Sequence, residues 1–380
     1  MKVLMVVSWY TTKDAPVMTA GVFHYEQSMA LKPYCDMALY YPYDTELSCD
    51  FSAQEEKGLM TYRRNPNRRK LLGKVGIPNV LQAVSDLRRI CKEFQPDVIH
   101  AHCSIPAGRA AVLFGKLYGY PVVITEHNPM EALCLDNPSA KKHIHTAYRG
   151  SRSNICVSSN SMERLQEVFP DCSYQVIYNG IIDPNTIPKN GNQYAVPGKV
   201  NCCIVAAFYS LDIKGYQFLL PAIRQLKDEG MEIVLHICGG GDYLEHYQNL
   251  AQQLQITDNC IFYGQCDRTK VYSIMSQMDF SISASIYECS GVSVEEAMLL
   301  GKPLVVTRSG GANSLVTEDT AIVVDRGSTA PLVEGIRQMI QQKDRFDPAV
   351  IRQYAYENFE IDHVSRQYSR LYQAVTENVK

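Results

Sequence analysis

The chain has 380 residues, of which 46% are hydrophobic and 20% charged, and its formal net charge is −3. This length allows two domains with complete cores, the composition is that of a globular protein, and the small negative charge gives no overall field that would attract nucleic acid. No apolar run reaches the roughly 20 residues of a membrane-spanning helix.

The 13 cysteines are odd in number and scattered, and no two of them form a C-x-x-C pair. Several lie in apolar runs, such as Cys202 and Cys203. This pattern predicts reduced, buried thiols in a cytoplasmic protein, and neither a disulfide framework nor a zinc site. The apolar run at 3–7 is too short for a signal peptide and predicts a first core strand.

Strands and helices alternate through the first half of the chain. Apolar runs predict strands at 3–7, 96–100, 120–125 and within 155–161, and helical spacing of apolar residues predicts helices at 23–31, 80–94 and 106–117. His102 and His127 follow the second and third of these strands. Both are therefore expected at one edge of a sheet, although a lone histidine is more often structural.

Residues 62–74 contain the strongest cluster of positive charge, including Arg63 and Arg64. Such a run is usually a solvated face. The alternative is contact with an anionic acceptor or a lipid surface, with Leu71, Leu72, Val75 and Ile77 as apolar companions.

Pro184 to Lys199 is rich in proline and glycine and predicts a linker. Beyond it, strands are predicted at 200–207, 233–238, 261–265, 279–285, 304–306 and 321–325, and helices at 216–227, 243–254, 271–278 and 293–300. The fold class is therefore α/β, with two doubly wound, Rossmann-like domains facing a cleft. We predict a first domain at 1–186 and a second at 187–361.

Residues 279–307 form one strand–loop–helix–strand unit. Ser293 and Glu296 have the spacing of a capping box at the start of the helix, and Gly301 and Pro303 end it. A helix start offers free N–H groups to a phosphate. Glu288 and Glu296 would repel a phosphate but suit hydroxyl groups, so the unit predicts a sugar-nucleotide site.

The run from Glu288 to Met298, followed by Gly301-Lys302-Pro303, resembles the signature of retaining family 4 glycosyltransferases of the GT-B fold. The first half is similar in a looser way, at 97–102, 121–127 and the Asn179-Gly180 turn. The resemblance covers almost the whole chain. It implies that a last helix, about 362–380, packs back on the first domain.

The resemblance also implies roles for individual residues. Glu288 would hold the hydroxyls of the donor sugar, Glu296 those of the ribose, and His127 would lie near the donor sugar and its phosphates. Glu288 and His127 are the catalytic candidates. The donor-binding candidates are Lys214 at the diphosphate, Ser290, Gly291 and Val292 at the helix start, and Gly240, Gly264 and Gln265 near the nucleotide. The acceptor or cleft candidates are Gly21, His102, Arg63 and Arg64.

Two positions depart from the family pattern. The family commonly has an arginine a few residues before the lysine, where this chain has Phe208, Tyr209 and Ser210. It often has a glutamate where this chain has Ser314, so either that glutamate is not needed or Asn313 supplies the polar contact.

We therefore expect a retaining glycosyltransferase that uses a nucleotide diphosphate sugar, a UDP-sugar above others, as its donor. The acceptor would be a glycan or lipid-linked hydroxyl in surface polysaccharide or glycolipid assembly. No cofactor, no nucleic-acid partner and, because D-x-D is absent, no diphosphate-bridging metal are expected. The expected location is the cytoplasm, or peripherally at the inner membrane face. The alternatives are a sugar-nucleotide epimerase and a non-catalytic nucleotide-sugar-binding subunit; a phosphorylase would need a far longer chain.

Overall fold

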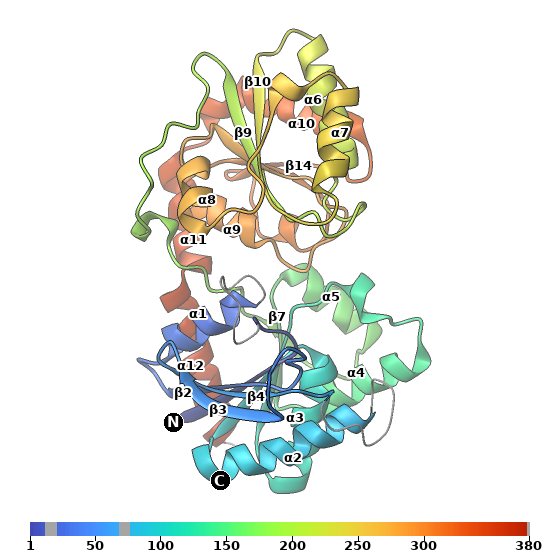
Figure 1. Cartoon of the computed structure of the whole chain (residues 1–380), viewed down its shortest axis with the longest axis vertical. Coiled ribbons are helices and arrows are strands. Elements are labelled where there is room, and N and C mark those ends of the chain that lie inside the picture. Colours follow the sequence, from blue (N-terminus) through green and yellow to red (C-terminus); the bar gives the residue numbers. More distant parts are fainter. Residues whose placement is uncertain (12–20, 68–76, 378–380) are drawn as a thin grey trace. The chain divides into compact units, whose positions relative to one another are not determined.

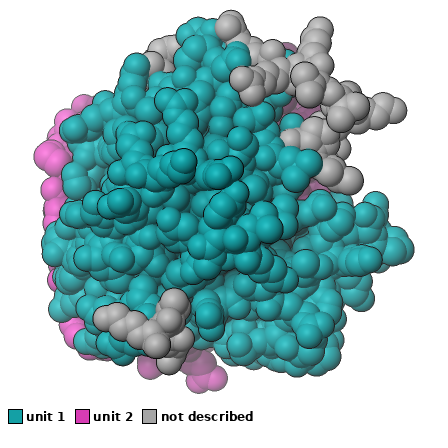
Figure 2. Space-filling model, turned by 90° about the horizontal axis from the view of Figure 1, so that it is seen from below, with its two compact units in different colours: residues 1–180, 361–380 teal, residues 181–360 magenta. Residues whose placement is uncertain are grey.

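The computed structural model describes residues 1–11, 21–67 and 77–377. The chain divides into two compact units, of which the first contains residues 1–180 and 361–380 and the second residues 181–360 (Figure 2). The sequence analysis placed these divisions at 186 and 361.

The first unit has an eight-stranded sheet with the order β3-β4-β2-β1-β5-β6-β7-β8. All neighbouring strands are parallel except the β3–β4 pair. The strands are β1 (Lys2–Val7), β2 (Asp36–Tyr41), β3 (Phe51–Glu56), β4 (Leu59–Arg64), β5 (Val98–His102), β6 (Val122–Glu126), β7 (Ser153–Cys156) and β8 (Tyr174–Val176). The strand order reverses between β1 and β5.

Helices cover both faces of this sheet (Figure 1). They are α1 (Val22–Leu31), α2 (Ile77–Phe94), α3 (Arg109–Tyr118), α4 (Pro138–Gly150), α5 (Ser159–Val168) and α12 (Ile361–Glu377), with short turns η1 (Ser104–Gly108) and η2 (Met130–Leu133). Each face of the sheet has its own hydrophobic core, and alternate residues of β1 point to opposite faces. Leu4 and Val6 pack with residues of α2 to α5, and Met5 packs with residues of α1 and α12.

The C-terminal helix α12 belongs to the first unit. Val364, Tyr368, Tyr372 and Val375 lie along one of its faces and are buried in the same core as Val3. It packs beside α1, although more than 300 residues separate the two helices in the sequence (Figure 1).

The second unit has a six-stranded, all-parallel sheet with the order β11-β10-β9-β12-β13-β14. The strands are β9 (Val200–Val205), β10 (Ile233–Cys238), β11 (Cys260–Phe262), β12 (Phe280–Ser283), β13 (Leu304–Thr307) and β14 (Ala321–Val324). The helices are α6 (Tyr216–Asp228), α7 (Leu244–Gln253), α8 (Arg268–Met275), α9 (Val292–Leu299), α10 (Thr329–Gln342) and α11 (Pro348–Phe359), and the short turns are η3 (Pro184–Thr186), η4 (Thr257–Asn259), η5 (Ala312–Ser314) and η6 (Lys343–Arg345). The α/β class with two doubly wound units is confirmed.

The β3–β4 hairpin was not predicted. Its edge strand β3 reads FSAQEE and is mostly polar, so it lacks the apolar alternation that marks a half-buried strand. The hairpin turns at Lys57 and Gly58, both of which have positive φ angles, 49° and 81°.

This hairpin corrects the interpretation of Arg63 and Arg64. Arg63 is 1% exposed, and its guanidinium bonds Asp44 at 2.9 Å and Glu56 at 2.7 Å. Arg64 is 8% exposed and pairs with Asp86. These two side chains are therefore interior ion pairs, and neither a solvated face nor free contacts for an acceptor. The rest of the cluster from residue 68 on, with Leu71, Leu72 and Val75, lies outside the described residues.

None of the helices in the described ranges has both the length and the apolar character needed to cross a membrane.

Replacing Arg63 with methionine should lower the free energy of unfolding by about 3–5 kcal/mol, because the buried Asp44 carboxylate would lose its counter-charge. The matched control is Arg366→Met, which removes an exposed pair with Asp362 in the same unit and should cost at most about 1 kcal/mol. Urea denaturation followed by circular dichroism measures both. Equal losses in the two variants would contradict a buried role for Arg63.

Candidate functional site

The strand order of the second unit reverses between β9 and β12. Open parallel sheets bind ligands at the carboxyl ends of the strands where this reversal occurs. The loop after β9 carries Lys214, and the loop after β12 carries Glu288. The two loops touch, since the Ile286 N–H donates to the Ile213 carbonyl at 2.7 Å.

Gly215 allows this close approach. Its φ angle is 72°, and a Cβ there would lie 1.9 Å from the carbonyl oxygen of Ala284, at the end of β12. Any other residue would push the two loops apart. The Lys214-Gly215 pair is therefore fixed against the β12 loop by backbone geometry.

Lys214 and Glu288 form an ion pair at 2.5 Å, with side chains 28% and 22% exposed. Ser285 also donates to the same carboxylate oxygen at 2.8 Å. The sequence predicted separate ligands for the two residues: a diphosphate for Lys214 and the donor sugar for Glu288. The structure places them side by side, so a cation and a carboxylate are presented together at the carboxyl ends of β9 and β12.

Helix α9 begins beside this pair. Gly291 is its N-cap, and no side chain caps the first turn. The predicted capping box was wrong because the helix starts at Val292, which makes Ser293 its second residue. Val292 is 39% exposed. The helix therefore presents backbone N–H groups without a side-chain acceptor, as an anion site requires.

Glu296 lies on the buried face of α9. It is 7% exposed and accepts a hydrogen bond from the Tyr272 hydroxyl at 2.7 Å. This bond holds the carboxylate in one position, next to the helix start.

Sequence analysis missed the neighbouring carboxyl of Glu295, which is fully buried. One of its oxygens accepts from Ser290 at 2.9 Å, and the other has no hydrogen-bond partner. Burial raises the pKa of Glu295 to about 8, the Ser290 bond opposes the shift, and the nearby Glu296 adds to it. Glu295 is therefore neutral at pH 7. The sequence did contain an indication of this buried carboxyl, because Glu295 is a second acidic residue in a largely apolar helix.

Gly240, Gly264 and Gln265 lie together on the other side of β9. A Cβ on Gly240 would come within 2.8 Å of the Gln265 side-chain oxygen, and the Gly239 N–H donates to the Gly264 carbonyl at 3.0 Å. The predicted donor-binding residues therefore line the loops after β9, β10, β11 and β12 of one sheet.

The structure also describes the positions that depart from the family pattern. Phe208 is buried and stacks on Tyr216, while Tyr209 is 68% exposed. Another cation reaches the β12 loop, since Arg326 donates to the Ile286 carbonyl at 2.7 Å. Sequence analysis had no signal for it because Arg326 follows β14, some 40 residues later.

The second position that departs from the family pattern is Ser314. Its hydroxyl donates to the Gly311 carbonyl at 2.7 Å, and the neighbouring Asn313 side chain accepts from the Gly310 N–H at 2.7 Å. Both side chains therefore shape the turn after β13.

In the first unit, His102 and His127 meet at the carboxyl ends of β5 and β6. Nδ1 of His102 and Nε2 of His127 are 2.8 Å apart. Burial lowers the pKa of His127 to about 3 and holds that of His102 well below its usual value, with neighbouring histidines adding to the effect on His102. Both imidazoles are therefore neutral.

Glu126 organises the loop that carries His127. It is 1% exposed and accepts from the backbone N–H groups of Ser104, His127 and Asn128 and from the Tyr148 hydroxyl. It thus positions the backbone of His127.

Gly21 directly precedes α1, with a φ angle of 65°. A Cβ there would lie 2.9 Å from the Trp9 carbonyl oxygen, so this glycine brings the start of α1 against the segment after β1. Helix α1 then carries His24 towards His102, with ring centroids 4.6 Å apart.

The Glu295→Gln variant should gain stability relative to the wild type as the pH rises from about 5 to 8. In that range the folded carboxyl holds a proton that the unfolded one releases, so the wild type loses on the order of 1 kcal/mol per pH unit. Glutamine mimics the neutral form and has no proton to lose. Thermal unfolding across this pH range, with the exposed Glu318→Gln as control, measures the difference. A constant offset between Glu295→Gln and wild type would contradict the raised pKa.

Comparisons with known proteins agree with this geometry. Residues 47–183 match the model for Glycosyltransferase Family 4, and residues 191–358 match that for Glycosyl transferases group 1. The N-acetyl-alpha-D-glucosaminyl L-malate synthase of Bacillus anthracis is 23% identical over 80% of this chain and 81% of its own length.

Two solved structures share the fold over nearly the entire chain. The sucrose-phosphate synthase of Thermosynechococcus elongatus has a TM-score of 0.83 at 15% identity, covering 100% of both chains. The Anabaena protein HepE in complex with UDP has a TM-score of 0.75 at 18% identity, covering 98% of this chain and 100% of its own. The chain belongs to the group 1, family 4 glycosyltransferases and has the GT-B fold.

Proposed function

We propose that this glycosyltransferase moves a sugar from a nucleotide diphosphate sugar, a UDP-sugar, to an acceptor hydroxyl with retention of anomeric configuration. The observation that carries the proposal is the Lys214–Glu288 pair beside the uncapped start of α9, where the strand order of the second unit reverses. UDP as the nucleotide is supported by HepE, whose structure of the same fold contains UDP.

The diphosphate would bind to Lys214 and to the N–H groups at the start of α9. Lys214 has three donors, so it can keep one bond to Glu288 and direct others to phosphate oxygens. Negative charge grows on the diphosphate as the glycosidic bond breaks, and fixed positive groups at that place lower the barrier. Arg326, which follows β14 and bonds the carbonyl of Ile286 in the β12 loop, is a candidate second cation in place of the arginine that this chain lacks.

The sugars of the donor would face the carboxylates. Glu288 remains a hydrogen-bond acceptor for the hydroxyls of the transferred sugar, because Lys214 and Ser285 both bond to one of its two oxygens. Glu296, held by Tyr272, would take the ribose hydroxyls. Gly240, Gly264 and Gln265 would lie along the nucleotide. His127 of the first unit is the second proposed catalytic residue, as a neutral hydrogen-bonding group.

In the reaction, the acceptor oxygen bonds to the anomeric carbon while the bond from that carbon to the diphosphate oxygen breaks. The acceptor proton goes to the departing diphosphate, which leaves as UDP. We assign no enzymic nucleophile, because Glu288 is engaged by a lysine and a serine and serves better as a binding group. Attack on the face from which the diphosphate departs would then give retention.

The acceptor is proposed to carry a hydroxyl on a glycan or lipid, in polysaccharide or glycolipid assembly. The malate product named for the Bacillus anthracis relative supports a hydroxyl as the accepting group. Arg63 and Arg64 cannot contribute to a contact with a membrane surface, because both side chains are buried.

Among UDP-, GDP- and ADP-sugars, a UDP-sugar should raise the thermal unfolding temperature most. Ligand that binds only the folded state stabilises it by about 2.7 kcal/mol at 100 times its dissociation constant. Differential scanning fluorimetry with equal concentrations of the three classes measures this. A larger rise in unfolding temperature with GDP-sugars or ADP-sugars would contradict UDP as the nucleotide of the donor.

Lys214→Met should weaken UDP binding, and Glu288→Gln should lower turnover on the order of 100-fold or more while UDP still binds. The reason is that lysine faces the diphosphate, whereas the carboxylate faces the transferred sugar. Calorimetry with UDP and release of UDP from the best donor in the presence of acceptor measure the two effects. Glu318→Gln, exposed in the same unit, is the control.

The same assay separates the alternatives. Unchanged turnover in Glu288→Gln would contradict the site. Conversion of the donor without acceptor would indicate an epimerase, and donor binding with no conversion under any condition would indicate a binding subunit. Nuclear magnetic resonance of the product distinguishes retention from inversion.

A further inference from the structure

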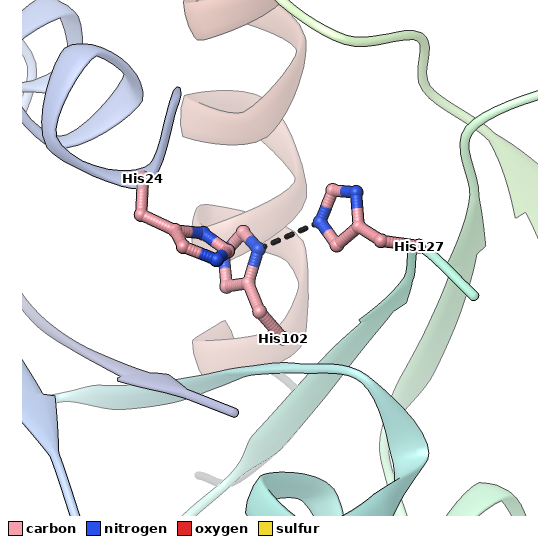
Figure 3. A group of neighbouring side chains, drawn as sticks. All are labelled: His24, His102 and His127. Carbon is pink, nitrogen blue, oxygen red and sulfur yellow. Dashed lines mark hydrogen bonds between the residues drawn. The ribbon is translucent and has the colours of Figure 1, made fainter. Parts of the chain in front are cut away.

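Three histidines from distant segments converge in the first unit (Figure 3). His24 projects from α1, His102 from the end of β5, and His127 from the loop after β6. The ends of β1 and β5 flank the point at which the strand order of this sheet reverses. The three side chains therefore meet where an open α/β sheet is suited to hold a ligand.

The nitrogens of this cluster lack enough partners. Both ring nitrogens of His24 and Nε2 of His102 are buried without a hydrogen bond. A buried polar atom without a hydrogen-bond partner destabilises the folded state. His100, the adjacent buried histidine, behaves differently: it bonds Tyr372 and Thr125 at 2.7 Å each. Among the buried histidines of the described residues, all ring nitrogens without a partner therefore belong to this cluster.

The geometry suits a metal ion. One nitrogen from each of the three rings lies within 4.8 Å of those of the other two. Zn²⁺ binds imidazole nitrogens at about 2.0–2.1 Å, which places tetrahedral ligands about 3.3 Å apart. Binding would therefore require the rings to adjust their positions. The hydrogen bond between His102 and His127 would be replaced by two bonds to the ion.

The surroundings favour coordination. The ring centroids of Trp9 and Phe23 lie 4.0–6.2 Å from those of His24 and His127. An apolar wall of this kind restricts access of water to a metal site. A histidine binds a metal ion through the lone pair of a ring nitrogen, and this cluster has ring nitrogens that no hydrogen bond occupies.

We propose that His24, His102 and His127 bind a divalent transition-metal ion of the zinc type, with a fourth position left for water or an oxygen of a bound molecule. Three imidazoles are ligands that zinc accepts with an open position, and carboxylate-preferring Mg²⁺ and Ca²⁺ are not suited to them. The proposal does not depend on sugar transfer and assigns no bridge to a diphosphate.

The test uses the full chain, stripped with a chelator, incubated with Zn²⁺ and dialysed, with metal content measured by mass spectrometry. Wild type should retain about one Zn²⁺ per chain. His24→Phe should lose it, with affinity at least about 100-fold weaker by calorimetry, because one of three protein ligands is gone. His145→Ala is the matched control: it removes the cluster of His145, Asp171 and Cys172, where His145 already bonds Asp171, and should leave the zinc content unchanged.

His24→Phe keeps an aromatic ring beside Trp9 and Phe23 and removes the two unsatisfied nitrogens of His24, so it should fold. Zinc should raise the unfolding temperature of the wild type and not that of His24→Phe. Co²⁺ should give the visible spectrum of a four-coordinate ion in wild type only. Equal zinc content in wild type and His24→Phe, loss of zinc in His145→Ala, or no thermal effect of zinc on wild type would overturn the proposal and leave ordered water as the partner of these rings.

Discussion

The arrangement of the second unit depends on the close backbone contact between the loop after β9 and the end of β12. These strands are neighbours across the reversal of strand order, so their carboxyl ends open on the same crevice. Gly215 lets the loops touch, and the Ile286–Ile213 hydrogen bond fixes them. A lysine and a glutamate some 70 residues apart thereby become an ion pair at the start of α9. A cation, free helix N–H groups and a carboxylate thus lie in one place, and the proposed nucleotide-sugar site is built on them.

Buried polar groups recur in both units, and they divide into satisfied and unsatisfied ones. Arg63, Arg64 and His100 bond buried partners, and they act as internal cross-links of the first unit. Glu295 and His24 retain polar atoms without partners. Buried polar atoms without partners destabilise a protein, so their presence calls for a functional explanation. Glu295 supports the α9 start as a neutral carboxyl bonded to Ser290, and His24 belongs to the proposed metal site.

The first unit is completed by the end of the chain. Helix α12 buries its apolar face against the same core as β1 and α1, and its hydroxyls reach the interior, where Tyr372 bonds His100 and Tyr368 bonds Thr125. Tyr372 and Tyr368 thus bond side chains of β5 and β6, although both tyrosines come after the second unit in the sequence.

By itself, the sequence determined the α/β class, the alternation of elements in both halves and the loop that carries Glu288, because periodicity and glycine or proline breaks are local properties. Its motifs also identified the family. Only the tertiary structure decided which side chains meet. It paired Lys214 with Glu288, buried Arg63 and Arg64, moved the α9 cap from Ser293 to Gly291, and joined His24 to His102 and His127. Burial and hydrogen bonding depend on strand order and loop contacts between residues far apart in the chain, and no local pattern records these.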